Sequence, residues 1–249
     1  MSLLWERRIG GTLYQVRNAG RTRRLYTNGV FHSQYNPARP VTGSVWDLLL
    51  LPAFFYAPGE LRRVLVLGVG GGAVIQQLRQ FVQPEAIVGV ELNAVHLSIA
   101  RRFFGVKGAG VFLEQADAVD WMRRYRGPGF DMIVDDLFCD YAGEPQRAVF
   151  ADADWVGKLG HCLNPGGMIV SNFTSPLELD VSAFVSDAVC RRRFRSAFSL
   201  STSRNYNAVG VFLEKPADTR TLRERLKRVP LLDPRKSRGL RYHIRTLGL

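Results

Sequence analysis

The chain has 249 residues, of which 46% are hydrophobic, and a formal net charge of +12, a composition that supplies one substantial core within a single domain. No apolar run approaches ~18 residues without a charge, so no membrane span is expected. The first ten residues make a poor signal peptide because Glu6, Arg7 and Arg8 follow only two leucines, and we therefore expect a cytoplasmic protein.

Residues 1–43 are expected to form a small antiparallel β-hairpin cap. Short β-like runs alternate there with turn signals, of which Asn28-Gly29 is the clearest. The expected strands are Thr12–Val16, Arg24–Thr27 and Val30–His32. Residues 44–56 are expected to form a linking helix with Ser44 as its N-cap. Pro52 should kink or shorten this helix.

Residues 44–216 are expected to form a Rossmann-like α/β domain. From Arg63 onward strands and helices alternate, which is typical of a mostly parallel, doubly wound sheet with right-handed crossovers and helices on both faces. The last two strands, near Phe198–Thr202 and Ala208–Leu213, should add an antiparallel edge.

The apolar strand at residues 64–67 leads directly into a glycine-rich turn. Gly68, Gly70 and Gly72 would let the backbone approach a ligand without Cβ contact, and Glu91, after the next strand, can accept hydrogen bonds from both hydroxyls of a ribose. This combination predicts a nucleoside cofactor. It does not by itself separate nicotinamide dinucleotides from S-adenosylmethionine compounds.

Two further strands end in acidic residues. Residues 110–114 run into Asp117-Ala118, and residues 131–134 run into Asp135-Asp136. Because parallel strands of such a sheet end at one edge, we expect these carboxylates to gather near the glycine turn.

Taken in order, these motifs resemble the spermidine synthase family of aminopropyltransferases, a branch of the S-adenosylmethionine-dependent methyltransferase fold. The resemblance runs from about Gly11 to Pro216. The motifs that carry it are Leu13-Tyr14-Gln15, Asn28-Gly29-Val30, the glycine loop, Val90-Glu91-Leu92-Asn93, Asp117-Ala118, Val134-Asp135 and Leu163-Asn164-Pro165-Gly166-Gly167.

The resemblance implies how S-adenosylmethionine, or its decarboxylated form, would be held as co-substrate. Glu91 would bind the ribose hydroxyls, Asp117 the adenine amino group, and Gln15 would lie near the thioether or aminopropyl arm. The implied cofactor-binding residues are Gln15, Gly68, Gly70, Gly71, Gly72, Glu91, Asp117 and Ala118.

The resemblance also implies the catalytic residues, Asp135 and Asp136. The reaction would be an in-line displacement at a carbon beside a sulfonium, with Asp135 orienting a small-molecule amine and accepting its proton. If both carboxylates point inward, Asp136 makes Asp135 harder to ionise.

Three departures from the family pattern bear on the substrates. Gly71 stands where the family has an acid, Phe138 where it has a second catalytic-loop acid, and Ser44-Val45-Trp46-Asp47 in the neighbourhood of a Tyr-His pair. Without an acid at Gly71 there is room for the carboxylate of intact S-adenosylmethionine, which slightly favours methyl transfer, although Gly71 could instead serve only the turn.

Two alternatives stay open beside methyl transfer. The chain could be an aminopropyltransferase that makes spermidine or another polyamine, with Asp135, Asp136, Asp140 and Glu144 supplying an acidic substrate site. It could also be a non-catalytic protein that binds the cofactor or RNA.

Residues 217–249 are expected to be a basic helix and tail. From Pro216 to Leu249 there are ten Lys or Arg against three acids, and leucines at 222 and 226 predict a docked amphipathic helix. The tail could alternatively bind nucleic acid. The family resemblance further suggests a homodimer assembled through the N-terminal hairpins.

The cysteines and histidines show no metal-ligand spacing, so no metal is expected. The three cysteines are an odd number and are expected to be reduced, with Cys139 a small buried residue. Among the four histidines only His32, after the Asn28-Gly29 turn, lies near a position that faces substrate in the family, and a solvated hairpin residue is the favoured interpretation.

Overall fold

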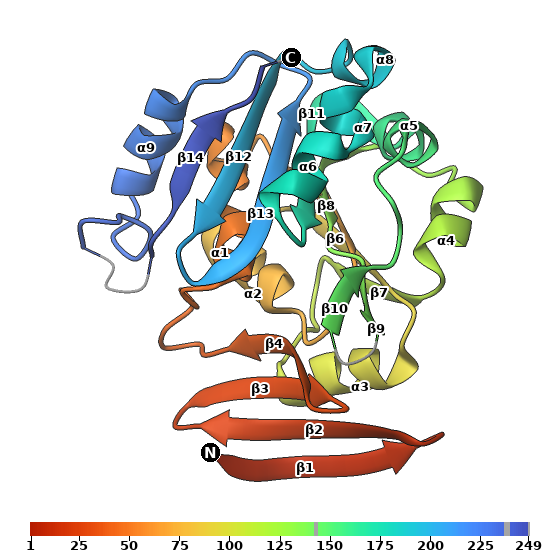
Figure 1. Ribbon diagram of the computed structural model, residues 1–249. Coiled ribbons are helices and arrows are strands. Elements are labelled where there is room, and N and C mark those ends of the chain that lie inside the picture. Colours follow the sequence, from red (N-terminus) through yellow and green to blue (C-terminus); the bar gives the residue numbers. More distant parts are fainter. Residues whose placement is uncertain (142–143, 237–239, 249) are drawn as a thin grey trace.

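An eight-stranded sheet forms the centre of the protein in the computed structural model, which describes residues 1–141, 144–236 and 240–248 (Figure 1). Its strand order is β14-β12-β13-β11-β8-β5-β6-β7, and the five strands from β11 to β7 run parallel. The bounds are β5 (Arg63–Leu67), β6 (Ala86–Glu91), β7 (Val111–Gln115), β8 (Phe130–Asp135), β11 (Leu163–Phe173), β12 (Ser196–Thr202), β13 (Asn205–Leu213) and β14 (His243–Thr246). The predicted doubly wound sheet with an antiparallel edge is confirmed.

Helices cover both faces of this sheet because its central strands are apolar on both sides. Along β5, Val64 and Val66 pack into one buried cluster, whereas Leu65 and Leu67 pack into the other. One face is covered by α1 (Val45–Leu50), the 3-10 helix η1 (Leu51–Phe55), α2 (Ala73–Phe81), α3 (Ala94–Phe103) and α9 (Thr219–Lys227). The other is covered by α4 (Ala118–Arg124), α5 (Ala153–His161), α6 (Pro176–Val181), α7 (Ala183–Ser186) and α8 (Ala188–Arg191).

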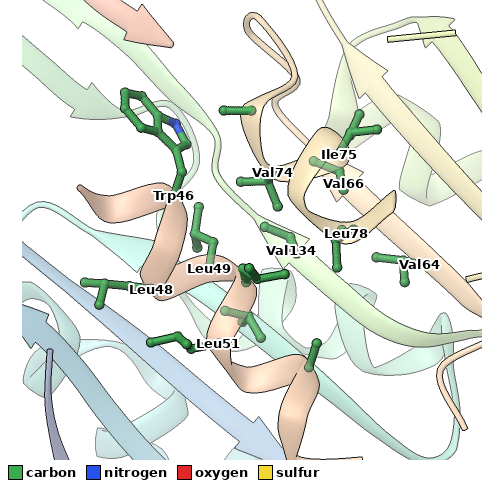
Figure 2. Close-up of a cluster of buried hydrophobic side chains, with 14 of the residues drawn as sticks. Trp46, Leu48, Leu49, Leu51, Val64, Val66, Val74, Ile75, Leu78 and Val134 are labelled. Carbon is green, nitrogen blue, oxygen red and sulfur yellow. The ribbon is translucent and has the colours of Figure 1, made fainter. Parts of the chain in front are cut away.

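The linking helix α1 is buried between α2 and the sheet. Figure 2 shows Val134 of the sheet between Leu49 of α1 and Leu78 of α2, and Leu48 and Leu51 belong to the same buried cluster. As predicted, the proline at 52 ends the α-helical part, and the chain continues as η1. Asp47 holds the preceding loop, because its carboxylate accepts hydrogen bonds from the N–H groups of Thr42 and Gly43 at 2.9 and 2.7 Å.

The N-terminal cap is a four-stranded antiparallel sheet, with β1 (Ser2–Ile9), β2 (Thr12–Ala19), β3 (Thr22–Thr27) and β4 (Val30–Tyr35) in chain order. The outermost strand β1 was not predicted from the sequence. The cap packs on α3: the Tyr14 hydroxyl accepts a hydrogen bond from Asn93 at 3.0 Å, and the hydroxyl of Thr27 lies 2.8 Å from Nε2 of His96. It thereby places β4 beside the glycine loop.

The C-terminal residues join the main sheet. Helix α9 buries Leu222 and Leu226 completely, as their spacing predicts, and β14 pairs antiparallel with β12 at the sheet edge (Figure 1). The strand β14 was not predicted. No helix in the described part of the chain is long and apolar enough to cross a membrane.

Candidate active site

A cavity of about 550 Å³ lies at the edge of the sheet where the parallel strands end. Its walls are the glycine loop, the ends of β6, β8 and β11, the start of β13, strand β4, the start of α1, and the hairpin formed by β9 (Phe138–Tyr141) and β10 (Glu144–Arg147). This volume is in the range of small-molecule sites. The edge is also where ligands bind in open α/β sheets.

The ends of β5 and β8 approach each other so closely that position 68 requires glycine. A Cβ at this position would lie 2.2 Å from the carbonyl oxygen of Asp136, and φ is +83°, a conformation that L side chains rarely adopt. Gly68, Gly70 and Gly72 all line the cavity.

Gly71 packs away from this lining, against the cap. A Cβ at Gly71 would lie 2.7 Å from the Cβ of Ser33 in β4 and 3.1 Å from the ring of Phe104. The residue is therefore required for packing between the glycine loop and β4. Packing alone is enough to explain the glycine at this position, so the argument from Gly71 for methyl transfer loses its force.

Glu91, at the end of β6, lines the cavity. Its Oε2 accepts hydrogen bonds from the backbone N–H groups of Val69 and Gly70 at 3.0 and 2.8 Å, and its Oε1 accepts one from Asn93 at 2.9 Å. These contacts tie the acid to the glycine loop, as the predicted pairing of turn and acid requires. A carboxylate offers about four acceptor positions, so capacity remains for a ligand hydroxyl.

Asp117 and Ala118 also line the cavity. Asp117 is the N-cap of α4, and its Oδ1 accepts a hydrogen bond from the N–H of Asp120 at 3.0 Å. The cap fixes the position of this carboxylate beside the end of β6.

Gln15 does not belong to the cavity lining. Its side chain binds Glu6 on the neighbouring strand β1, and its Oε1 accepts hydrogen bonds from Arg17. The prediction that it lies near the aminopropyl arm came only from the resemblance. In this chain the side chain of Gln15 forms hydrogen bonds within the cap.

Asp135 and Asp136 point in different directions. Asp135 ends β8 and is fully buried; its Oδ2 accepts hydrogen bonds from Arg147 at 2.7 Å, Ser171 at 3.0 Å and Trp155 at 3.2 Å. It is absent from the lining, whereas Asp136 is part of it. Neighbouring residues at a strand end face opposite sides, so only one of the two carboxylates can reach the cavity.

The environment of Asp136 suits a proton acceptor. Burial raises the pKa of this carboxyl to about 6, and the neighbouring Asp135 and Glu91 charges act in the same direction, while a hydrogen bond from Asn172 opposes them. Asn172 donates from Nδ2 to Oδ1 of Asp136 at 2.7 Å, and its own Oδ1 accepts from Asn207 at 3.0 Å. A carboxyl with a pKa near 6 is ionised at neutral pH and still holds a proton well.

Sequence reasoning missed most of the wall beyond Asp136. This wall consists of uncharged polar and aromatic residues, namely Phe31, Ser44, Trp46, Asn172, Asn205 and Asn207. Asn205 and Asn207 could not be found from the pattern of parallel strand ends, because they lie at the start of the antiparallel strand β13. His32 lines the cavity as well, so it is not the solvated hairpin residue that was favoured.

The described lining is acidic although the protein is strongly basic. Glu91, Asp117 and Asp136 contribute carboxylates, and no Lys or Arg among the residues described there takes part. Burial lowers the pKa of His96 to about 4, so this ring adds no positive charge at neutral pH. Fixed negative charge in a low-dielectric cavity favours cationic ligands.

Three further expectations from the sequence concern Cys139, the acidic loop and metal ligands. Cys139 lines the cavity and is exposed, so the expectation of a buried residue is wrong. The side chains of Asp140 and Glu144, proposed from sequence as part of an acidic loop, lie outside the described residues. Within the described residues no group of His, Cys, Asp and Glu could hold a metal ion.

The sheet order and the cavity at its edge define a Rossmann-like fold of the S-adenosylmethionine-dependent methyltransferase type. Comparison with known proteins places the chain more narrowly. Residues 48–215, more than half of the chain, match the family model described as "Spermine/spermidine synthase domain". The chain belongs to the spermine/spermidine synthase family, as the resemblance in its motifs predicted.

Curated relatives are polyamine aminopropyltransferases. That of Escherichia coli O1:K1 is 30% identical over 121 residues, a match that covers 46% of this chain and 41% of that protein. Polyamine aminopropyltransferase 2 of Caldanaerobacter subterraneus is 26% identical over 132 residues, covering 52% of this chain and 43% of that protein. The matches therefore span less than half the length of these relatives.

Solved structures share the fold at low sequence identity. A probable spermidine synthase from Corynebacterium glutamicum superposes with a TM-score of 0.70 at 18% identity, covering 89% of this chain and 86% of that one. Human methyltransferase-like protein 13, in complex with SAH, gives a TM-score of 0.59 at 22% identity, covering 82% of this chain and 94% of that one. The likeness to methyltransferases is thus one of fold.

The slight preference for methyl transfer drawn from the sequence is not supported. The matching family and the curated relatives fit the aminopropyltransferase alternative better. The error arose at Gly71, whose packing against Ser33 accounts for the missing acid without reference to the cofactor.

Proposed function

We propose that the protein transfers an aminopropyl group from decarboxylated S-adenosylmethionine to an amine. The observation that carries this proposal is the charge of the cavity: three carboxylates, and no Lys or Arg within the described lining, in a chain of net charge +12. Both substrates of such a reaction are cations. The family and the curated relatives support the same activity.

The cofactor half of the site is supplied by the strands on one side of β8. Gly68 and Gly70 bring the backbone to the ligand, Glu91 offers acceptors to the ribose hydroxyls, and Asp117 faces the adenine amino group. Intact S-adenosylmethionine would add a carboxylate to a cavity whose described lining holds no cation to pair with it. Two like charges about 4 Å apart near a protein surface repel by up to about 4 kcal/mol, so the decarboxylated form is favoured.

Asp136 is the group that handles the proton of the amine. The acceptor nitrogen forms a bond to the aminopropyl carbon while the bond from this carbon to sulfur breaks, and the electron pair of that bond neutralises the sulfonium. The proton lost by nitrogen passes to Asp136, whose pKa is raised by burial to about 6. The sulfonium supplies the leaving group, so the protein's task is to orient the amine and stabilise the positive charge that develops on nitrogen.

Asp135 has a different task in this proposal. Its buried ion pair with Arg147 ties β8 to the β9–β10 hairpin, and the Nη1 of Arg147 also donates to the carbonyl of Asn172 at 2.5 Å. Asp135 therefore fixes the strand end that presents Asp136. It is a positioning residue, and the catalytic carboxylate is Asp136.

Titration calorimetry with the two forms of the cofactor tests the proposal. We expect the purified chain to bind decarboxylated S-adenosylmethionine more than about tenfold more tightly than the intact compound, since 1.4 kcal/mol is a factor of ten. The Asp136→Asn variant should keep this preference and lose turnover. Preference for the intact compound would restore methyl transfer, and binding of neither would contradict a transferase of this kind.

A further inference from the structure

We infer that His96 is a second ribose-binding residue beside Glu91. Its Nδ1–H donates a hydrogen bond to one ribose hydroxyl of the cofactor, and the same hydroxyl donates to Oε1 of Glu91. This inference rests on the proposed aminopropyl transfer, because it concerns the nucleoside that this reaction uses. The sequence motifs assigned the ribose to Glu91 alone and gave His96 no role.

His96 and Glu91 are separated by a gap that fits one oxygen atom. Both residues line the cavity, and Nδ1 of His96 lies 3.9 Å from Oε1 of Glu91. This separation is too long for a direct hydrogen bond, whereas an oxygen about 2.8 Å from each atom fits between them. The two side chains are only 8% and 11% exposed, so hydrogen bonds formed in the gap are strengthened by a low local dielectric. The gap matches a hydroxyl group, which can accept from one side and donate to the other.

The Oε1 atom of Glu91 is placed to receive the hydroxyl hydrogen. Oε2 accepts hydrogen bonds from the N–H groups of Val69 and Gly70 at 3.0 and 2.8 Å, and Oε1 accepts one from the N–H of Asn93 at 2.9 Å. A carboxylate oxygen has two lone pairs, so Oε1 can take a further hydrogen bond beside the one from Asn93. This is the oxygen that faces Nδ1 of His96.

The surroundings of His96 determine which ring nitrogen carries the hydrogen. Burial lowers the pKa of the ring to about 4, so at neutral pH the ring is uncharged and has one N–H. Nε2 lies 2.8 Å from Oγ1 of Thr27, a hydroxyl that can donate as well as accept. A hydrogen on Nδ1 places a donor opposite the Glu91 carboxylate, whereas a lone pair there would face a negative charge. The favoured tautomer therefore has Thr27 donating to Nε2, and Nδ1–H faces the gap.

The imidazole ring is held in place by its own helix and by the N-terminal sheet. His96 lies in the first turn of α3, where the side chain of Asn93 accepts hydrogen bonds from the N–H groups of Val95 and His96 at 2.9 and 3.3 Å. Tyr14 meets the imidazole edge to face with ring centroids 5.8 Å apart, and the ring of His32 lies 5.0 Å away. A donor fixed in this way loses little conformational freedom when the ligand binds.

Methylthioadenosine, the nucleoside product of the proposed reaction, tests the inference. Calorimetric titration compares this compound with its 2′-deoxy and 3′-deoxy analogues, in the wild type and in His96→Phe, which keeps an aromatic ring and has no N–H. We expect His96→Phe to bind methylthioadenosine about fivefold to tenfold more weakly than the wild type does. Removal of one of the two hydroxyls should cost this variant at least about threefold less affinity than it costs the wild type. Losses that simply multiply at both hydroxyl positions would overturn the inference.

A second variant and a spectroscopic measurement separate this hydrogen bond from a structural role. The amide nitrogen of Asn can take the position of Nδ1, so His96→Asn should keep part of the coupling to the hydroxyl that His96→Phe loses. Nitrogen-15 NMR of the wild type should show the imidazole hydrogen on Nδ1, and Thr27→Val should raise the share of the other tautomer. A hydrogen on Nε2 in the wild type would contradict the inference.

These outcomes are distinct from failure of the proposed function. Binding of methylthioadenosine without coupling between His96 and either hydroxyl refutes the role of His96 and leaves aminopropyl transfer intact. Failure of the wild type to bind methylthioadenosine would contradict the inference, and failure to bind decarboxylated S-adenosylmethionine as well would refute the proposed function.

Discussion

Asn172 donates a hydrogen bond from its Nδ2 to Oδ1 of Asp136 at 2.7 Å. The bond joins the ends of two adjacent parallel strands, β11 and β8, and stabilises the ionised form of a carboxylate whose pKa burial raises to about 6. The amide of Asn172 is itself oriented by Asn207, whose Nδ2 binds its oxygen at 3.0 Å. The charge state of the proposed catalytic group is therefore set by neighbours on two other strands.

The pH dependence of turnover should report this carboxyl. Because Asp136 accepts a proton only when ionised, kcat/KM expressed per free-base amine should rise about tenfold per pH unit below 6 and level off above it. Asn172→Ala removes the hydrogen bond that lowers the pKa, so the midpoint should move to higher pH. Asn207→Ala keeps the direct bond and should move the midpoint less. A pH profile that is the same in all three proteins would exclude Asp136 as the proton acceptor.

Asp136 should also lower stability at neutral pH. Its pKa is raised above the ordinary value of 3.8, so the folded state binds this proton more tightly than the unfolded chain does. The resulting stability is present below pH 3.8 and is lost as the pH rises through about 6. Asp136→Asn should therefore raise the free energy of unfolding at pH 7.5 by about 2 kcal/mol, as measured by urea denaturation. No gain in stability would contradict the buried, ionisable environment assigned to Asp136.

The Asp135–Arg147 pair should be essential to folding. The side chains of both residues are at most 1% exposed, so Arg147→Met leaves a buried carboxylate without its partner, at a cost of about 3–5 kcal/mol. Adding Asp135→Leu to this variant should recover part of the loss. The matched control is the exposed pair of Arg220 and Glu224, where Glu224→Ala should change stability by less than about 1 kcal/mol. Equal effects at the two pairs would refute the structural role given to Asp135.

Gly71 should tolerate no side chain. Its added Cβ would meet the Cβ of Ser33 at 2.7 Å, so Gly71→Ala should destabilise the protein by about 1–3 kcal/mol, and Ser33→Gly in the same chain should restore part of this. Gly157, on α5, is the control, since a Cβ there meets nothing within 4 Å and Ala favours helix. A melting temperature of Gly71→Ala equal to that of the wild type would show that the glycine does not serve packing.

The sheet, and the residues that line the cavity at the ends of β5, β6 and β7, could be predicted from sequence because their signals are local. An apolar strand, a glycine turn and an acid after the next strand occur within 28 residues, from Val64 to Glu91, and each follows from how parallel strands end at one edge. The strand β14 could not be predicted, because its identity depends on pairing with β12, which is distant in the chain.

The cavity wall beyond Asp136 was largely hidden from sequence reasoning. Asp135 and Asp136 are adjacent and chemically identical, and only the residue at which β8 ends decides which of them faces the cavity. Asn207 belongs to an antiparallel strand and follows no acid or glycine motif. Gly71 was misread because its neighbour Ser33 comes from the cap, a contact that no local pattern reveals.

The mass of the acceptor product tests the central claim most directly. The protein is incubated with equal amounts of intact and decarboxylated S-adenosylmethionine and an amine, and the product is analysed by mass spectrometry, with Asp136→Asn as the control. We expect the amine to gain an aminopropyl group and the control to give no product. A product that has gained a methyl group, or an aminopropyl product formed equally well by Asp136→Asn, would contradict the account.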